Sequence, residues 1–487
     1  MSLRQKIAQG VAWTTMQNVG MQAISLVVFF LLARLLHPEA FGLVALAVVF
    51  IDFVALFLSY GLPEAIVQRH TLDQEHLDTG FWVILGAGIV LTLLGIASAG
   101  PVAALFKQPQ LKSIIRWLSL SFFLRSLSQV QVAILRRQLA LKIIATRSMV
   151  AGFVGGATAV IMALLGFGVW SLVGRQLIIE LVSVLILWPA CNWWPGLKFS
   201  IRHGKELFGF GVSMMGGNIL TFFNRRTDDF LIGYFLGPVA LGYYTVAYRL
   251  LLIMTQLWGQ IVGSVAFPAF SRVQKELERL REMFYSATRL TSLVAFPAFL
   301  GIFALVPELV PTLFGQQWAP SIPVMQVLTF IGLLHAVLFF QYTVMAGVGK
   351  PSWYLGLQVM ITVANVIGFL IAVRWGIVAV AISYVIVAYL FAPLSVWLVY
   401  RLIEIDLLRY LRLFLPAATG SLVMLAFIFS LKLSLTNLVP LQFLLTGCIV
   451  MSALAYAVTI RLVAPSLAYQ AIDLLRSTLQ GIKKEES

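Results

Sequence analysis

The most regular feature of the chain is a succession of long apolar runs separated by short polar stretches. An α-helix needs about 20 mostly apolar residues to cross the hydrocarbon core of a bilayer, since each residue advances the helix by about 1.5 Å. The pattern predicts an all-α polytopic membrane protein. About fourteen runs reach this length, at residues 10–34, 41–62, 80–106, 113–134, 146–166, 169–190, 207–236, 240–267, 287–313, 322–346, 353–373, 377–399, 413–433 and 442–463.

The run from Leu207 to Gly237 differs from the others, because charged residues lie near its middle. These residues are Arg225, Arg226, Asp228 and Asp229, and Asn224 precedes them. Each charge at the centre of a membrane helix costs about 2.5 to 3.5 kcal/mol on insertion scales. We therefore expect this helix to face a polar cavity or charged partners rather than lipid.

Helical spacing divides these polar residues between faces. Arg225 shares a face with Asp228 and Asp229, three and four residues on, and with Asn218 and Thr221 in the preceding turns. This stripe predicts a cavity wall. Two interpretations of Arg225 stay open: it binds an anionic substrate while Asp228 or Asp229 restrains it, or it only neutralises these aspartates.

A repeat links the two halves of the chain. Residues 30–47 align without gaps to residues 230–247, and both copies keep the proline and glycine of Pro38/Pro238 and Gly42/Gly242. Asn18 also corresponds to Asn218. Six predicted helices separate the copies, so both run in the same direction, and we expect a pseudo-twofold axis along the membrane normal. The predicted domains are an N-terminal lobe at 1–206, a C-terminal lobe at 207–412, two further helices at 413–463 and a cytoplasmic tail at 464–487.

Composition and charge agree with a membrane protein. The 487 residues are 60% hydrophobic and 11% charged, whereas soluble domains contain about 25% charged residues. The net charge of +15 comes mainly from Lys and Arg in loops. These loops lie mainly on the same side of the membrane as both termini, so the positive-inside rule predicts that the termini are cytoplasmic. The charge is thus explained by topology, which argues against a nucleic-acid partner.

The loop after the eighth run contains an amphipathic stretch, from Ser271 to Phe284. Its apolar residues recur at helical spacing, and one face carries Val273, Leu277, Leu280 and Phe284. We expect an amphipathic helix on the inner membrane surface.

Five further ionisable residues lie within predicted spans, where such groups are functional hypotheses. Arg125 and Arg249 are candidates for substrate binding, and Asp52, Glu180 and His335 are candidates for ion coupling or ion pairing. The alternative for each is a structural ion pair or interhelical hydrogen bond. Lys432 lies close enough to a helix end to snorkel, so no role is predicted for it.

Sequence motifs for enzyme chemistry are largely missing. The segment from Gly347 to Pro351, GVGKP, has the GK of a phosphate loop but lacks its first glycine and its Ser or Thr. The two cysteines, Cys191 and Cys448, predict neither a disulfide framework nor a metal site. We predict no enzyme activity, no metal and no cofactor.

Three stretches of the chain resemble one family of membrane transporters. They read RRTDDFLIGYFLGPVALGYYTVAYRL from Arg225, YGLPEAIVQR from Tyr60 and LFGQQWAPSIPVMQVL from Leu313. They resemble local patterns of the polysaccharide transporters in the multidrug/oligosaccharidyl-lipid/polysaccharide (MOP) exporter superfamily, in particular the Wzx and WzxC flippases. The resemblance implies a V-shaped fold with a central cavity in the bacterial inner membrane.

The resemblance also implies a substrate, an oligosaccharide repeat unit on undecaprenyl diphosphate. A guanidinium can bind phosphate oxygens bidentately, which suits Arg225 and Arg226, and Tyr244 and Trp258 are candidates for stacking on sugars. Implied partners are this lipid-linked glycan, membrane lipids, a polysaccharide polymerase and glycosyltransferases. Two alternatives stay open: a cation-coupled multidrug exporter of the same superfamily, and a non-transporting subunit of a polymerase complex.

Overall fold

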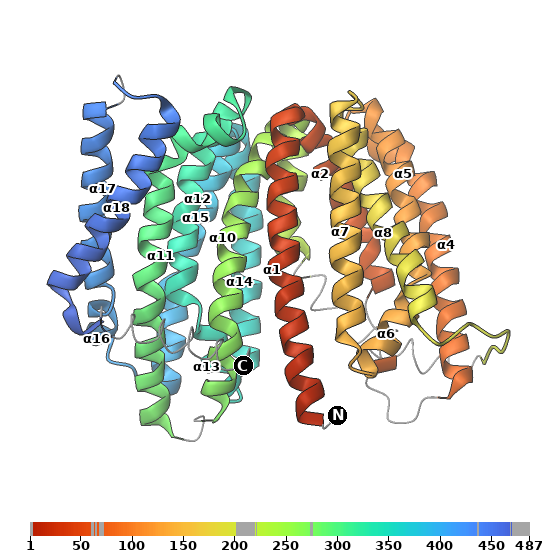
Figure 1. The fold of residues 1–487 in the computed structure, drawn as a ribbon, viewed down its shortest axis with the longest axis horizontal. Helices are drawn as coiled ribbons and strands as arrows, with labels where there is room; N and C mark the ends of the chain where they lie inside the picture. Colours follow the sequence, from red (N-terminus) through yellow and green to blue (C-terminus); the bar gives the residue numbers. More distant parts are fainter. Residues whose placement is uncertain are drawn as a thin grey trace. The chain divides into compact units, whose positions relative to one another are not determined.

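A computed structural model describes residues 3–59, 63, 66–67, 73–200, 220, 222–272, 276–435, 438–467 and 469. The regular structure in these ranges is helical throughout (Figure 1). Thirteen helical segments of the described residues are long and apolar enough to cross a membrane. The expected span at 207–236 lies partly outside the described residues. The predicted class, an all-α polytopic membrane protein, is confirmed.

The chain forms two compact units, Met1–Thr245 and Val246–Ser487. The boundary falls within one long helix, α10, at Gly237–Arg272. The predicted lobe boundaries at residues 206 and 412 stay a prediction. The helices of the first unit are α1 Leu3–Leu35, α2 Pro38–Ser59, α4 Gln74–Leu105, α5 Pro109–Ser126, α6 Gln129–Arg137, α7 Leu141–Leu164, α8 Trp170–Ala190, a helix at 222–235 and the start of α10.

Helices of the first unit pack in pairs, α4 on α5, α7 on α8, α1 on α7, and α5 on both α2 and α8. Small residues allow α4 and α5 to approach closely, because Gly88 and Gly95 of α4 face Ser126 and Ser119 of α5. Membrane helices associate largely through such close packing, since lipid offers no hydrophobic driving force between them. Within this unit α1 begins at the same end as α6, and the turn from α1 to α2 lies at the opposite end (Figure 1).

The second unit contains the rest of α10 and the later helices. Here α11 packs on α12 and α17, α15 packs on α12 and α14, and α17 packs on α18. The elements are α11 Leu277–Leu313, η1 Gln316–Ser321, α12 Ile322–Leu338, α13 Gln341–Gly347, α14 Pro351–Ala372, η2 Val373–Trp375, α15 Ile377–Ile403, α16 Leu407–Arg412, α17 Leu415–Leu435 and α18 Leu441–Val463.

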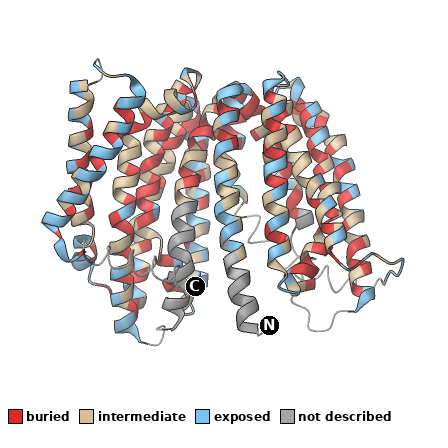
Figure 2. Cartoon of the chain, in the orientation of Figure 1, coloured by how far each residue is buried: buried red, intermediate tan, exposed pale blue. Residues whose placement is uncertain are grey.

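In each unit, whether a residue is buried depends on the face of the helix on which it lies. Buried residues line the faces that helices turn toward their neighbours, and many outward faces are exposed (Figure 2). Large apolar side chains on these outward faces, such as Leu164 of α7 and Leu390 of α15, are exposed. In a soluble protein such apolar surface would indicate an interface, whereas here it is the surface that contacts lipid.

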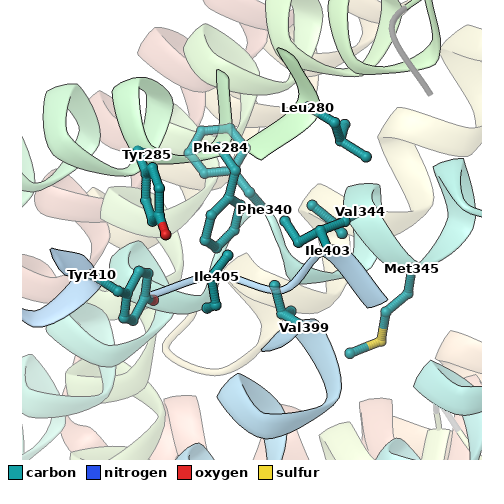
Figure 3. Close-up of a cluster of buried hydrophobic side chains, with 10 residues drawn as sticks. All are labelled: Leu280, Phe284, Tyr285, Phe340, Val344, Met345, Val399, Ile403, Ile405 and Tyr410. Carbon is teal, nitrogen blue, oxygen red and sulfur yellow. The ribbon is translucent and has the colours of Figure 1, made fainter. Parts of the chain in front are cut away.

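The expected amphipathic surface helix at 271–284 is not a separate element. Its second half, from Leu277, forms the first turns of α11, which continues to Leu313. Leu280 and Phe284 are buried in a cluster that also contains Phe340 and Tyr410 (Figure 3). Leu280 and Phe284 therefore pack on protein, which corrects the prediction that they lie on the membrane surface, whereas Leu277 is exposed and Val273 lies outside the described residues.

The repeated helix junctions contact each other reciprocally. A β-carbon at Gly42 would overlap the Pro238 carbonyl oxygen, and a β-carbon at Gly242 would overlap the Pro38 carbonyl oxygen. Reciprocal contacts of this kind, in which each residue meets the counterpart of its own partner, are typical of two segments related by a twofold axis. Both turns meet at one place, so the helices leading into them run toward the same end. The pseudo-twofold axis that relates the two lobes stays a prediction.

The helix α17 is joined to α11 by an ion pair that is largely shielded from solvent. Lys432 Nζ of α17 lies 2.8 Å from Glu308 Oε2 of α11, and it also donates to the Ala304 carbonyl oxygen at 2.7 Å. Both charged side chains are about 15% exposed. The prediction that Lys432 snorkels to the membrane surface is therefore wrong, because a carboxylate on the neighbouring helix lies within reach of the ammonium group.

Candidate functional site

An intramembrane charged cluster in the first unit joins α2 to the helix at 222–235. Arg226 Nη1 donates to Asp229 Oδ2 at 3.0 Å, and Arg226 Nη2 donates to Asp52 Oδ2 on α2. The Arg226 side chain is 31% exposed, Asp52 is 40% exposed and Asp229 is 10% exposed. We call Asp52, Arg226, Asp228 and Asp229 the charged cluster. One guanidinium thus bridges two helices through two carboxylates.

The fourth member of the cluster, Asp228, has a neutral partner. Tyr244 of α10 donates its hydroxyl to Asp228 Oδ2 at 2.8 Å, and the backbone N–H of Asp229 donates to Asp228 Oδ1. Tyr244 is fully buried. The prediction that Tyr244 stacks on sugars is therefore wrong, because its ring is enclosed by protein and its hydroxyl holds a carboxylate. The side chain of Trp258, the other stacking candidate, lies outside the described residues.

Arg225 differs from Arg226 although the two are adjacent. Its side chain is exposed, and it forms no ion pair with any other residue that the structure describes. Successive helical residues point about 100° apart, so only one of the two guanidinium groups can reach the carboxylates of α2 and the next turn. The expected restraint of Arg225 by Asp228 or Asp229 is not found. Arg226 takes that place, while Asn218 and Thr221 lie outside the described residues.

A second polar contact joins α5 to α8. Arg125 donates through Nε and Nη2 to Glu180 Oε1, at 3.2 and 2.7 Å, and Gln176 donates to the same oxygen at 3.4 Å. On the adjoining α7, Arg147 donates to Ser148 Oγ. The sequence singled out Arg125 and Glu180 separately, but only the packing of α5 on α8 makes them partners.

The two remaining candidates lie in the second unit. Arg249 of α10 is half-buried and has an interaction partner, so it is held in place. His335 of α12 is exposed, although its neighbours Leu334 and Ala336 are buried. The substrate and coupling roles of both residues stay predictions.

The chemistry that the charged cluster can support follows from its three carboxylates and their shared guanidinium. Within the described ranges no three His, Cys, Asp or Glu side chains are placed to hold a metal ion. Cys191 and Cys448 are both buried and free. The charged cluster instead combines three carboxylates with one shared guanidinium, which suits uptake of a cation or proton, beside an exposed second guanidinium that suits an anion.

Comparisons with known proteins give a family and a fold. The chain matches the model of a family described as "Polysaccharide biosynthesis protein" over residues 31–323. It is similar to the succinoglycan biosynthesis transport protein ExoT of Rhizobium meliloti, with 30% identity over 66% of this chain and 65% of ExoT, just under two thirds of that relative's length. It is also similar to the lipopolysaccharide biosynthesis protein WzxC of Escherichia coli, with 29% identity over 69% of each chain.

A solved structure described as the lipid II flippase MurJ, in an inward closed conformation, resembles the fold. The TM-score is 0.76 at 14% sequence identity, and the match covers 94% of this chain and 99% of MurJ. At this identity the likeness concerns the course of the helices and not the side chains of a site. The likeness agrees with the predicted class, an all-α polytopic membrane protein, and the V shape with its central cavity stays a prediction.

Proposed function

Because the chain belongs to the family of polysaccharide biosynthesis proteins, we propose that it moves a lipid-linked glycan across the bacterial inner membrane. The proposed substrate is an oligosaccharide repeat unit on undecaprenyl diphosphate, transported by alternating access from the cytoplasmic to the outer leaflet. No bond is made or broken in this process, so the chain is a transporter and not an enzyme. ExoT, named a transport protein for a polysaccharide, supports the proposal.

The observation that carries the proposal is the charged cluster inside a membrane-spanning bundle. Charges in such a place are costly and need a function or a partner. The bridge from Arg226 to Asp52 and Asp229 satisfies part of this need, and the exposed Arg225 beside it offers a guanidinium for the diphosphate. The carboxylates are suited to taking up the cation or proton that couples transport.

The orientation that we propose follows the positive-inside rule. Both termini lie in the cytoplasm together with Arg136, Lys205 and Arg279, and the turns at Pro38 and Pro238 lie outside. Reporter fusions or cysteine labelling at these positions test the orientation. Labelling of residue 205, which lies outside the described residues, by an impermeant reagent in intact cells would refute it.

The exposed guanidinium of Arg225 is expected to contribute to export and not to folding. Arg225→Ala should leave the membrane level of the protein near wild type and lower the rate of glycan export about tenfold or more, because a charge-assisted hydrogen bond contributes about 1.5 to 3 kcal/mol. Arg225→Lys keeps the charge but loses the bidentate geometry, so it should retain part of the rate. Wild-type export by Arg225→Ala would remove this residue from the proposed site.

A deletion strain tests the function itself. We expect the lipid-linked repeat unit to accumulate on the cytoplasmic leaflet, where impermeant glycan-oxidising reagents do not reach it in intact cells. Accumulation on the outer leaflet would favour the alternative of a non-transporting subunit of a polymerase complex. Normal polysaccharide with raised drug sensitivity would favour a multidrug exporter. Copurification with a polysaccharide polymerase or glycosyltransferases tests the proposed protein partners, and their absence from a crosslinked complex would argue against them.

A further inference from the structure

A groove of about 610 Å³ opens among four helices of the second unit. Leu333 and Val337 of α12 form one wall, Pro393 and Trp397 of α15 form another, and Leu411 of α16 lies at its end. The fourteen lining residues include no charged side chain. The groove lies in a different unit from the charged cluster, so the nature of its ligand is independent of the proposed function.

The end of the groove formed by α16 is held in place by the protein alone. Tyr410 of α16 donates its hydroxyl to the Val337 carbonyl oxygen at 3.1 Å, and its ring stacks on Phe284 of α11 with centroids 5.7 Å apart (Figure 3). Arg409 binds Glu282 of α11 bidentately, at 2.6 and 2.8 Å. The groove is therefore preformed, which lowers the entropic cost of filling it.

Two arginines lie beside residues that line the groove, Arg401 in the last turn of α15 and Arg412 at the end of α16. The Arg401 guanidinium lies 5.5 Å from the ring centroid of Trp397, which lines the groove, and 5.9 Å from that of Trp353. Arg412 directly follows the lining residue Leu411, and both Arg401 and Arg412 are exposed. A guanidinium stacked on indole rings keeps its N–H groups directed outward from its edge, where they can bind phosphate oxygens.

We propose that this groove binds one acyl chain of an anionic membrane phospholipid, whose phosphate is held by Arg401 and Arg412. At about 30 Å³ for a water-sized group, the groove has room for about 20 methylene-sized groups, which is one phospholipid chain. Basic pockets between membrane helices on the cytoplasmic side are typical sites for anionic headgroups.

The test uses the full chain in nanodiscs of phosphatidylglycerol and phosphatidylethanolamine in equal amounts, released into detergent and weighed intact by native mass spectrometry. We expect the wild type to retain one phosphatidylglycerol in preference to phosphatidylethanolamine. Arg401→Gln should lower this retention about fivefold, since one basic residue near a membrane surface contributes about 1 kcal/mol, and Arg401→Lys should retain most of it. Ala392→Trp, which fills the groove, should abolish retention of both lipids.

Matched controls separate the groove from the rest of the surface. Ile386→Trp adds the same ring at an exposed position of the same helix, and Arg374→Gln removes a charge before the other end of α15. Both should retain phosphatidylglycerol like the wild type. Equal retention of the two lipids would refute the preference for an anionic headgroup. Undiminished retention by Ala392→Trp would refute the assignment of the groove as the binding site. Displacement of phosphatidylglycerol by equimolar undecaprenyl phosphate would identify a polyprenyl carrier lipid, and not a bilayer phospholipid, as the occupant and would overturn the proposal.

Discussion

Replacement of Arg226 by alanine is expected to remove most of the folded protein from the membrane. The change leaves Asp229, which is 10% exposed, without its ionic partner and breaks the bridge to Asp52 on α2. Breaking a fully buried pair costs about 3 to 5 kcal/mol. Arg226 is 31% exposed, so we expect a loss near the lower end, about 3 kcal/mol. Immunoblots of isolated membranes and thermal unfolding of the purified protein measure this loss.

A double variant that removes one positive and one negative charge tests whether the ion pair of Arg226 and Asp229 has only a structural role. Arg226→Gln combined with Asp229→Asn removes both charges. It should restore most of the membrane level, because the carboxylate left without its ionic partner, Asp52, is 40% exposed, whereas the 10% exposed Asp229 is no longer charged. We expect export to stay low in this variant, since the cluster has lost its ability to exchange partners during transport. Full recovery of export would limit the cluster to a structural role. Arg225→Ala is the matched control, and a loss of protein in that variant equal to the loss in Arg226→Ala would contradict the ion-pair assignment.

A methyl group at the repeated helix junction should be nearly as damaging. Gly42→Ala places a β-carbon against the Pro238 carbonyl oxygen, a backbone atom that cannot rotate away. The two turns must therefore separate, and such overpacking costs about 1 to 3 kcal/mol. Gly242→Ala should behave alike, because it meets the Pro38 carbonyl oxygen in the same way. Thermal unfolding in detergent and the rate of glycan export measure the effect.

The reciprocal contact makes a sharper prediction for the double variant. Once one methyl group has separated the turns, the second meets less resistance, so the double variant should lose less stability than the sum of the single variants. Gly86→Ala in α4 is the matched control, since a β-carbon there meets nothing within 4 Å. Additive losses at positions 42 and 242, or an equal loss at position 86, would contradict the contact.

Some features of the charged cluster were visible in the sequence and others were not. The unusual density of charge between Arg225 and Asp229 identified the helix, because intramembrane charge stands out against any apolar run. The sequence favoured Arg225 as the partner of the aspartates, since spacing along one helix treats the helix as if it were alone. In the structure Arg226, and not Arg225, binds the aspartates, because Asp52, a residue far away in the chain, accepts a hydrogen bond from it. The bond from Tyr244 to Asp228 was missed because aromatic residues at helix ends are common membrane anchors.

The sequence by itself determined the helical class, the approximate spans, the family resemblance and the repeat with its matched Pro and Gly turns. These features depend on local hydrophobicity and short motifs, which are independent of the neighbouring helices. Tertiary structure alone decided the partners: Arg226 with Asp52, Arg125 with Glu180, Lys432 with Glu308, and the start of α11 with α13 and α16. Ion pairs and buried faces depend on which helix surfaces meet, because each polar group inside a bilayer takes its partner from whatever lies within hydrogen-bonding reach.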